Sequence, residues 1–321
     1  MERCYNVKKT KEMEKSYKNA FITPIFVCLS EVYDSVDLLR LQEKFVELTA
    51  EEILSFLGLS KENYKEILCY VLLNSIKQGI GEVNILSLNP FLTQEVLKEL
   101  NLSGKVLIRA KDLNEFQSSL NGIDYGVYVD PYYDGDELLS FVSDYSAKNK
   151  VPVVVLLYDD LEKTGEINST YNQTPIQYIE NLGFLDRDVS ILGGVYADKD
   201  DFVTISSYGA KMIICPYESL NFGRGSPNLY AMLNAGVNVE IASPIINDIC
   251  KEFEFGSVVS RGLLNDENIL PIDEVESLAE TETIKPDFDE EKYLKLQEKI
   301  NNIKEKLKNA DSWTTCKWVW N

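Results

Sequence analysis

The chain has 321 residues, of which 45% are apolar and 26% are charged, and it contains no histidine. Without an imidazole it has no Ser-His-Asp or Cys-His nucleophile, no histidine general base and no zinc site built from histidine. Its 52 acidic and 32 basic residues give a formal net charge of -20. Such a charge opposes binding to nucleic-acid phosphates or to an anionic membrane, so we expect neither as a partner.

The N-terminal residues and the cysteines favour a cytoplasmic protein. No apolar core of a signal peptide follows Met1, and no apolar run approaches the length of about 18 residues that a membrane span needs. The six cysteines form no C-x-x-C pair, which favours buried free thiols over disulfides or a thiolate metal site. They are Cys4, Cys28, Cys69, Cys215, Cys250 and Cys316.

Short runs rich in valine and isoleucine alternate with helical patterns along the chain. Strands are predicted at 22–29, 82–88, 105–109, 125–130, 151–157, 189–193, 211–215 and 237–242. Helices are predicted at 51–78, 93–100, 112–120, 136–148, 175–182, 200–208 and 228–234. Apolar strands joined by crossover helices are typical of a parallel sheet covered on both faces. Eight such units predict an α/β fold, a (β/α)8 TIM barrel. An open doubly wound sheet is the alternative, but the chain has no G-x-G-x-x-G phosphate loop.

The composition divides the chain into three predicted parts. Residues 1–20 form a charged N-terminal segment, residues 21–255 form the barrel, and residues 256–321 hold an acidic connector, an amphipathic helix and a Trp-rich tail. The helix is expected at 288–307, docked on its own domain or forming a dimer seam. The tail at 313–320 carries all three tryptophans and is expected to pack on the chain itself or on a partner. We therefore expect a protein partner or self-association through 288–321.

Five segments, in their order along the chain, resemble the amidohydrolase superfamily, in particular its aminohydrolases, chlorohydrolases and deaminases. They are VPVVVLLYD at 151–159, QTPIQYIENLGFL at 173–185, ILGGVY at 191–196, GAKMIICP at 209–216 and NAGVNV at 234–239. The resemblance covers about 126–243 well and 22–109 loosely. It implies a (β/α)8 barrel with its site at the C-terminal mouth. The small β-sandwich of that family is expected to be largely absent here, with an extra C-terminal helix in its place.

The resemblance also implies a divalent metal held by a His-x-His on strand one, histidines on strands five and six, and an aspartate on strand eight. The corresponding positions here are Ser30, Leu156, Gly193 and Pro244. The proton-shuttling glutamate of the family corresponds to Asp159. We therefore expect no metal, no cofactor and a pseudoenzyme.

Carboxylates and tyrosines follow several predicted strands. The carboxylates Glu31, Asp130, Asp159 and Asp160 could hold Mg²⁺ or Mn²⁺, or could serve as turn residues and helix caps. The tyrosines are Tyr132, Tyr133, Tyr158, Tyr196 and Tyr217. They could stack a small planar ligand, or they could fill a packed and inert mouth.

The sequence thus predicts an amidohydrolase-like barrel without its metal centre, which binds a small molecule or a protein partner and does not catalyse a reaction. The alternative is a hydrolase or deaminase that acts on C–N bonds with a carboxylate-bound cation, for which Asp159 is the candidate catalytic residue. A third hypothesis is a structural subunit of a larger assembly. The candidate ligand-binding residues are Tyr132, Tyr158, Asp159, Tyr196, Glu218 and Arg224.

Overall fold

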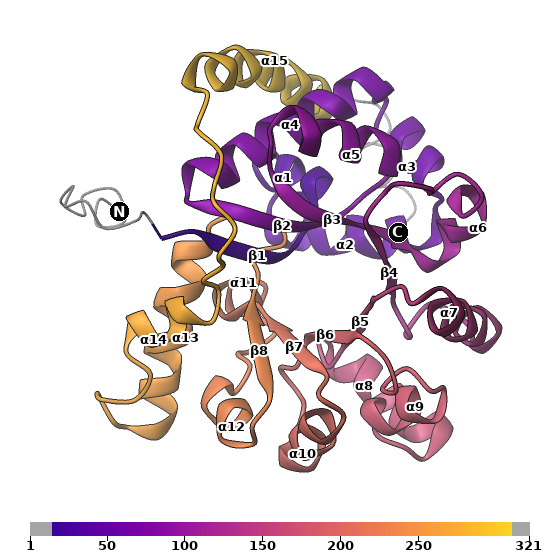
Figure 1. Cartoon of the computed structure of the whole chain (residues 1–321), viewed down its shortest axis with the longest axis vertical. Coiled ribbons are helices and arrows are strands. Elements are labelled where there is room, and N and C mark those ends of the chain that lie inside the picture. The colour runs from indigo at the N-terminus through magenta and orange to yellow at the C-terminus, as the bar shows by residue number, and fades with distance from the viewer. Residues whose placement is uncertain (1–14, 310–321) are drawn as a thin grey trace.

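The computed structural model describes residues 15–309 of the chain. Eight strands form one sheet in chain order, and every neighbouring pair is parallel (Figure 1). The strands are β1 Tyr17–Ile22, β2 Ile80–Leu86, β3 Ser103–Arg109, β4 Tyr125–Val129, β5 Val153–Leu157, β6 Val189–Gly193, β7 Lys211–Ile214 and β8 Asn238–Ile241. The sheet curves into a nearly closed barrel with helices around it, so the predicted (β/α)8 architecture is confirmed.

Helices surround the sheet on its outer side, and Pro or a side-chain cap starts many of them (Figure 1). Between β1 and β5 they are α1 Pro24–Ser30, α2 Ser35–Glu47, α3 Ala50–Phe56, α4 Lys61–Lys77, α5 Pro90–Glu99, α6 Leu113–Phe116 and α7 Asp136–Asn149. After β5 they are α8 Leu161–Tyr171, α9 Pro175–Asn181, α10 Lys199–Tyr208, α11 Pro216–Asn221, α12 Leu229–Asn234, α13 Ile249–Leu264, α14 Ile272–Ser277 and α15 Glu290–Asn309.

The first strand was predicted in the wrong place. The apolar run at 22–29 forms helix α1, whereas the strand occupies Tyr17–Ile22. Pro24 explains the difference, because proline fits the first turn of a helix and cannot donate a hydrogen bond within a strand. The single helix predicted at 51–78 is also wrong, since Gly58, with a φ of +64°, separates α3 from α4.

Two apolar clusters stabilise the barrel. The larger one fills the space between the strands and the surrounding helices. The smaller cluster draws residues from all eight strands or their ends, so it fills the barrel interior. It contains Ala20, Phe21, Leu107, Val154, Leu192, Ile213, Cys215 and Ala242, with Leu86, Tyr128 and Leu156 packed against it.

The seam between β8 and β1 is closed by side-chain hydrogen bonds. The side chain of Asn19 accepts from the Ser243 N–H at 3.1 Å and donates to the Ser243 carbonyl at 3.4 Å. Beside it, the N–H and the hydroxyl of Thr23 both donate to the Pro244 carbonyl at 2.9 Å. These bonds hold β1 and β8 together near the carboxyl end of the barrel.

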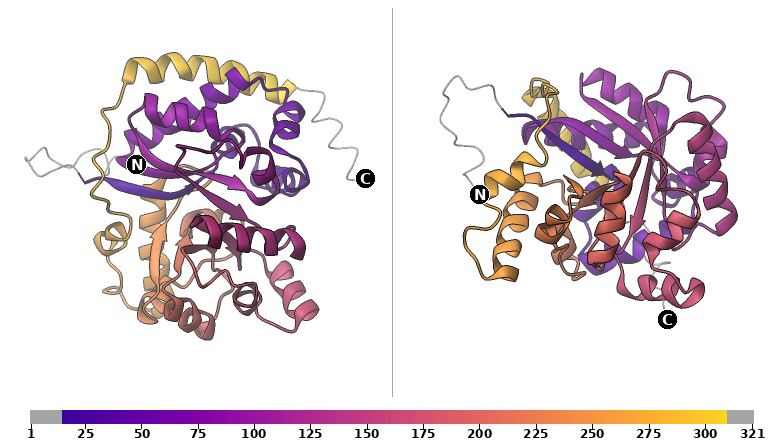
Figure 2. Two further views of the ribbon diagram at one scale, coloured as in Figure 1. Left: turned by 45° about the vertical axis from the view of Figure 1, so that its right-hand side comes forward. Right: turned by 60° about the horizontal axis from the view of Figure 1, so that its bottom comes forward.

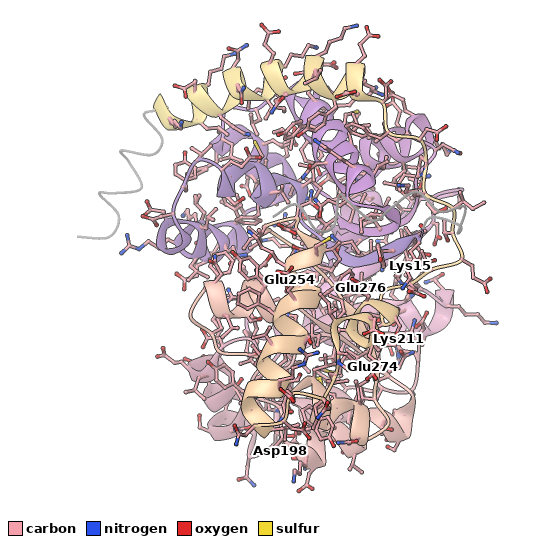
Figure 3. All side chains as sticks on the ribbon, turned by 90° about the vertical axis from the view of Figure 1, so that its left-hand side faces the viewer. Lys15, Asp198, Lys211, Glu254, Glu274 and Glu276 are labelled. Carbon is pink, nitrogen blue, oxygen red and sulfur yellow. The ribbon has the colours of Figure 1, made fainter. Side chains whose placement is uncertain are left out.

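The segment after β8 wraps around the barrel and returns to its first strand. Thr281 donates its N–H to the Ser16 carbonyl at 2.9 Å, and Lys15 forms an ion pair with Glu280 at 2.5 Å. In Figure 3 Lys15 lies beside Glu276, its second ionic partner, at 3.9 Å. The chain then crosses to α15, which lies along α4 (Figure 2).

Helix α15 docks on its own domain, as one of the two predicted arrangements requires. Tyr293 stacks on Tyr70 of α4 with ring centroids 5.2 Å apart, and Ile300, Ile303 and Leu307 are buried. The charged segment before residue 15, Cys4, Cys316 and the Trp-rich tail at 313–320 lie outside the described residues. No helix between residues 15 and 309 is long and apolar enough to cross a membrane.

Candidate functional site

A cavity of about 560 Å³ opens at the carboxyl ends of the strands. Active sites of (β/α)8 enzymes occur at this end of the barrel, and the volume is typical of small-molecule sites. Helix α2 forms part of its wall through Leu39, Gln42, Glu43 and Val46. This helix was not predicted from the sequence, so its contribution to the site was missed.

Most of the candidate ligand-binding residues meet in this cavity. Tyr132, Asp159, Tyr196, Glu218 and Arg224 all line it, although they follow four different strands. The predicted degenerate positions Leu156, Gly193 and Pro244 line it as well, at the ends of β5, β6 and β8. These residues, separated along the sequence, thus lie around one cavity at the carboxyl ends of the strands.

Tyr158 lies outside the cavity lining, contrary to the prediction. It has a φ of +60°, a left-handed conformation directly after β5, and its side chain is buried. The Tyr158 hydroxyl accepts a hydrogen bond from the Ile176 N–H at 3.0 Å. This tyrosine therefore anchors the start of α9. Tyr217 also lies outside the lining and packs on Phe255, with ring centroids 4.7 Å apart.

The misplaced first strand displaces two further predictions. Ser30 ends α1 and donates its hydroxyl to the Val27 carbonyl at 2.8 Å, and Glu31 pairs with Lys304 of α15. Neither residue lines the cavity. The end of β1 instead contributes Phe21 and Thr23. Pro24 was the signal for this strand end, because the residue before a proline is usually extended and a helix often starts at the proline.

An ion pair crosses the interior of the cavity. Arg224 Nη1 lies 2.5 Å from Asp159 Oδ2, and Arg224 Nη2 donates to Gln42 Oε1 at 3.4 Å. The Tyr196 hydroxyl donates to the Arg224 carbonyl at 2.6 Å and so fixes the loop that carries the arginine. The guanidinium links the end of β5 to α2 across the opening.

Glu218 is a buried carboxyl group in the cavity wall. Its Oε2 accepts hydrogen bonds from the N–H groups of Ile245 and Ile246 at 2.8 and 3.1 Å. Burial raises the pKa of Glu218 to about 7, against the lowering effect of these bonds and of Arg224. Behind it, burial and the charge of Glu218 raise the pKa of Glu252 well above its usual range. Glu252 Oε1 is buried and has no partner among residues 15–309.

A second acidic group follows β4. The Asp130 backbone N–H donates to Asp134 Oδ2 at 2.7 Å, while Asp130 Oδ1 accepts from the Tyr132 N–H at 3.2 Å. Burial, reinforced by the charge of Asp134, raises the pKa of Asp130 to about 7. Tyr132 Oη accepts from the Tyr158 N–H at 2.8 Å, which fixes its ring in the wall.

Asp160, a candidate metal ligand from the sequence, is a helix cap. Its side chain accepts a hydrogen bond from the Lys163 N–H at 3.0 Å and starts α8. This outcome matches the alternative assignment of the strand-end carboxylates to helix capping.

The donor set at the mouth does not suit a zinc-type centre. Leu156, Gly193 and Pro244 have no side-chain atom that could coordinate a metal, and the end of β1 offers only the Thr23 hydroxyl, which already donates to Pro244. Between residues 15 and 309, no group of three or more His, Cys, Asp or Glu side chains has a geometry that could hold a metal ion. The thiol of Cys215 also lies in the wall, and burial raises its pKa well above the usual range.

Comparisons with known proteins point to deaminases and hydrolases. No family model matches the chain. A 154-residue stretch is 26% identical to the 5-methylthioadenosine/S-adenosylhomocysteine deaminases of Bacillus cytotoxicus and Bacillus cereus. The stretch is 46% of this chain and 35% of each relative, so the match spans about a third of their length.

Solved structures extend the comparison to the fold. A zinc-bound adenosine deaminase from Xanthomonas campestris superposes with a TM-score of 0.70 at 15% identity, covering 81% of this chain and 64% of that one. The zinc complex of atrazine chlorohydrolase TrzN from Arthrobacter aurescens gives 0.68 at 15% identity, covering 83% and 69%. One stretch of this chain is therefore similar in sequence to deaminases, and the chain shares its fold with solved structures of an adenosine deaminase, a chlorohydrolase and an amidohydrolase from Brucella melitensis.

Proposed function

We propose that this chain binds a small planar molecule in the mouth cavity and lacks the metal-dependent reaction that its resemblance to amidohydrolases implies. The observation that carries the proposal is the set of strand ends around the cavity, where Leu156, Gly193 and Pro244 offer no side-chain atom that could bind a metal. A metal ion that activates water must be held by several fixed ligands. Where all of these ligand positions lack a coordinating atom, the metal ion is not held.

The cavity supports ligand binding without a metal. Its volume of about 560 Å³ is within the range of small-molecule sites, and apolar side chains form most of its floor and one wall. The relatives are named for adenosine derivatives and for atrazine, all of which contain a flat nitrogen heterocycle. We therefore propose a nitrogen heterocycle as the ligand.

A second candidate is a hydrolase or deaminase that acts on C–N bonds. The names of the relatives favour this function over a noncatalytic one. Glu31 lies outside the cavity, so of the three carboxylates expected to hold the cation only Asp130 and Asp159 remain there, and Glu218 lines the same cavity. Asp159 is paired with Arg224, which opposes its use as a metal ligand.

One pair of assays separates the two functions. Binding of adenosine and atrazine is measured by calorimetry, and release of ammonia or chloride is measured on the same samples. The first proposal predicts that the ligand binds and that no ammonia or chloride is released. The second predicts release of ammonia or chloride, which Asp159→Asn should abolish. Leu39→Trp narrows the mouth from α2 and is expected to weaken binding, whereas Val203→Trp on exposed α10 serves as the matched control.

A further inference from the structure

The charges of the mouth cavity are unbalanced. Seven carboxyl groups line it against four cationic side chains. The carboxyl groups are Glu43, Asp130, Asp134, Asp159, Asp160, Glu162 and Glu218, and the cations are Arg109, Lys111, Lys163 and Arg224. A bound ligand therefore meets an excess of negative charge and of hydrogen-bond acceptors.

Each of the four cations already binds an acceptor of the protein. Arg109 Nε donates to Asp112 Oδ2 at 2.6 Å, and Arg224 pairs with Asp159 at 2.5 Å. Lys163 donates to the Tyr133 hydroxyl at 2.5 Å, and Lys111 donates to the Val46 carbonyl. An anionic ligand would have to compete with these partners for every cation.

The deepest carboxyl groups, by contrast, keep an acceptor available. Asp130 and Glu218 have exposed fractions of 7% and 4%, and both line the cavity. In each of them the protein engages one oxygen through backbone N–H groups. The other oxygen of each carboxyl group accepts no hydrogen bond from residues 15–309. Unlike Glu252 Oε1, these two oxygens are not fully buried atoms without a partner. Two buried acceptors thus line the cavity from different strand ends, after β4 and after β7.

Aromatic rings line the same cavity. Phe21 and Tyr128 pack at 5.6 Å between ring centroids on the floor, and Phe26 and Phe45 pack at 5.4 Å on the wall of α1 and α2. The faces of such rings attract cations, and their flat shape accepts a planar group.

We infer that the ligand of this cavity is a flat organic cation rich in hydrogen-bond donors, such as an amidinium, a guanidinium or a protonated aminoheterocycle. This inference rests on the proposed function, because it specifies the ligand class of the same site. The acceptors of Asp130 and Glu218 pair with its N–H groups, and the aromatic walls contact its faces. The negative charge of the carboxyl groups that line the cavity disfavours ligands that carry a carboxylate or a phosphate.

The inference is tested with three probes of nearly equal shape and different charge. Benzamidinium, benzamide and benzoate are titrated into the full chain without a polyhistidine tag, with adenosine as a neutral planar reference. Benzamidinium is expected to bind at least about tenfold more tightly than benzamide, since a hydrogen bond between two charged groups is stronger than one with a neutral donor. Benzoate is expected to bind least.

Two variants locate the effect. Glu218→Gln and Asp130→Asn each replace an acceptor by an amide of nearly equal size, and each is expected to weaken benzamidinium binding roughly tenfold while benzamide binding stays the same. Unchanged benzamide binding shows that the cavity of the variant is intact. Glu254→Gln removes a carboxyl group from exposed α13 (Figure 3) and is the matched control, with no expected effect on either probe.

Each outcome bears on one proposal. Equal binding of benzamidinium and benzamide, or preferential binding of benzoate, would overturn the inference and leave the proposed function in place. If adenosine bound and benzamidinium did not, the inference would also be overturned and the proposed function would remain. If none of the four compounds bound, the proposed function itself would fall together with the inference.

Discussion

The two ends of the barrel hold cavities of similar volume, about 580 Å³ at the amino end and about 560 Å³ at the carboxyl end, but they differ in how their charges are paired. At the amino end, Lys18 lies 3.1 Å from Glu240 and 3.5 Å from Glu82. Burial opposes the charge of Lys18, yet the two glutamates outweigh it and raise its pKa. The hydroxyls of Thr281 and Thr283 also donate to Glu82, each at 3.2 Å.

At the carboxyl end, backbone N–H groups rather than cations contact the buried carboxyl groups of Asp130 and Glu218. The pKa values of Asp130 and Glu218 are both raised to about 7, and in each case burial is the main cause. Folded proteins keep uncompensated buried charge where function requires it, while paired charge of this kind serves stability. The difference supports the proposal of a ligand site at the carboxyl end, while the paired charges of the amino end serve the stability of the barrel.

The largest expected effect is a loss of stability with rising pH. The Glu218 pKa is about 7 in the folded chain and near 4.5 when unfolded, so unfolding releases a proton between these values. The free energy of unfolding should therefore fall across this window, by about 3 kcal/mol for this group. Urea unfolding from pH 4.5 to 8 measures the slope. Glu218→Gln should reduce the slope, of which Asp130 with its pKa of about 7 supplies a further part, and an identical slope in the variant would contradict the assignment.

Removing the central cation of the amino end comes next. Lys18→Met leaves Glu82 and Glu240 facing each other, and we expect a loss of about 2 kcal/mol in the free energy of unfolding. Lys105→Met is the matched control, because its partner Asp124 at 3.8 Å is largely exposed, and a loss below about 1 kcal/mol is expected. Equal losses in both variants would remove the distinction between paired and exposed charge at this end.

Arg224→Met should lower the free energy of unfolding and at the same time raise the affinity of the cavity for benzamidinium. The variant loses the ion pair with Asp159, which is expected to lower stability by about 1 kcal/mol. It also frees a carboxylate in the cavity, so benzamidinium should bind severalfold more tightly than to the parent chain. Calorimetry on both proteins tests this, and weaker binding in the variant would count against a cation site.

Tyr158→Phe should affect stability alone. The hydroxyl accepts from the Ile176 N–H and lies away from the cavity, so its removal is expected to lower stability by about 1 kcal/mol. Binding of benzamidinium and adenosine should remain as in the parent. A clear loss of affinity, with melting unchanged, would mean that Tyr158 belongs to the site after all.

Periodicity and strand composition were sufficient to predict the barrel. The runs at 125–130, 189–193 and 211–215 became β4, β6 and β7 with almost the expected bounds, because buried parallel strands are continuous apolar runs. The run at 22–29 failed, since an apolar run of this length also fits a buried helix and only Pro24 distinguished the two.

The site was predictable where it depended on strand order, and unpredictable where it depended on side-chain direction. Asp159, Glu218 and Arg224 follow strands whose carboxyl ends meet, so their convergence could be foreseen. The positive φ of Tyr158, which turns this residue out of the mouth, leaves no mark in the sequence. The same is true of the contact between Gln42 and Arg224, because it requires α2 to fold over the opening.

The most direct test of the account is the metal content of the chain, measured by elemental mass spectrometry. The protein is purified without a polyhistidine tag, incubated with zinc and with manganese, and desalted before measurement. The account predicts no stoichiometric metal, while adenosine or benzamidinium still binds. One tightly held metal ion per chain, lost in Asp159→Asn, would contradict the account and favour a working hydrolase.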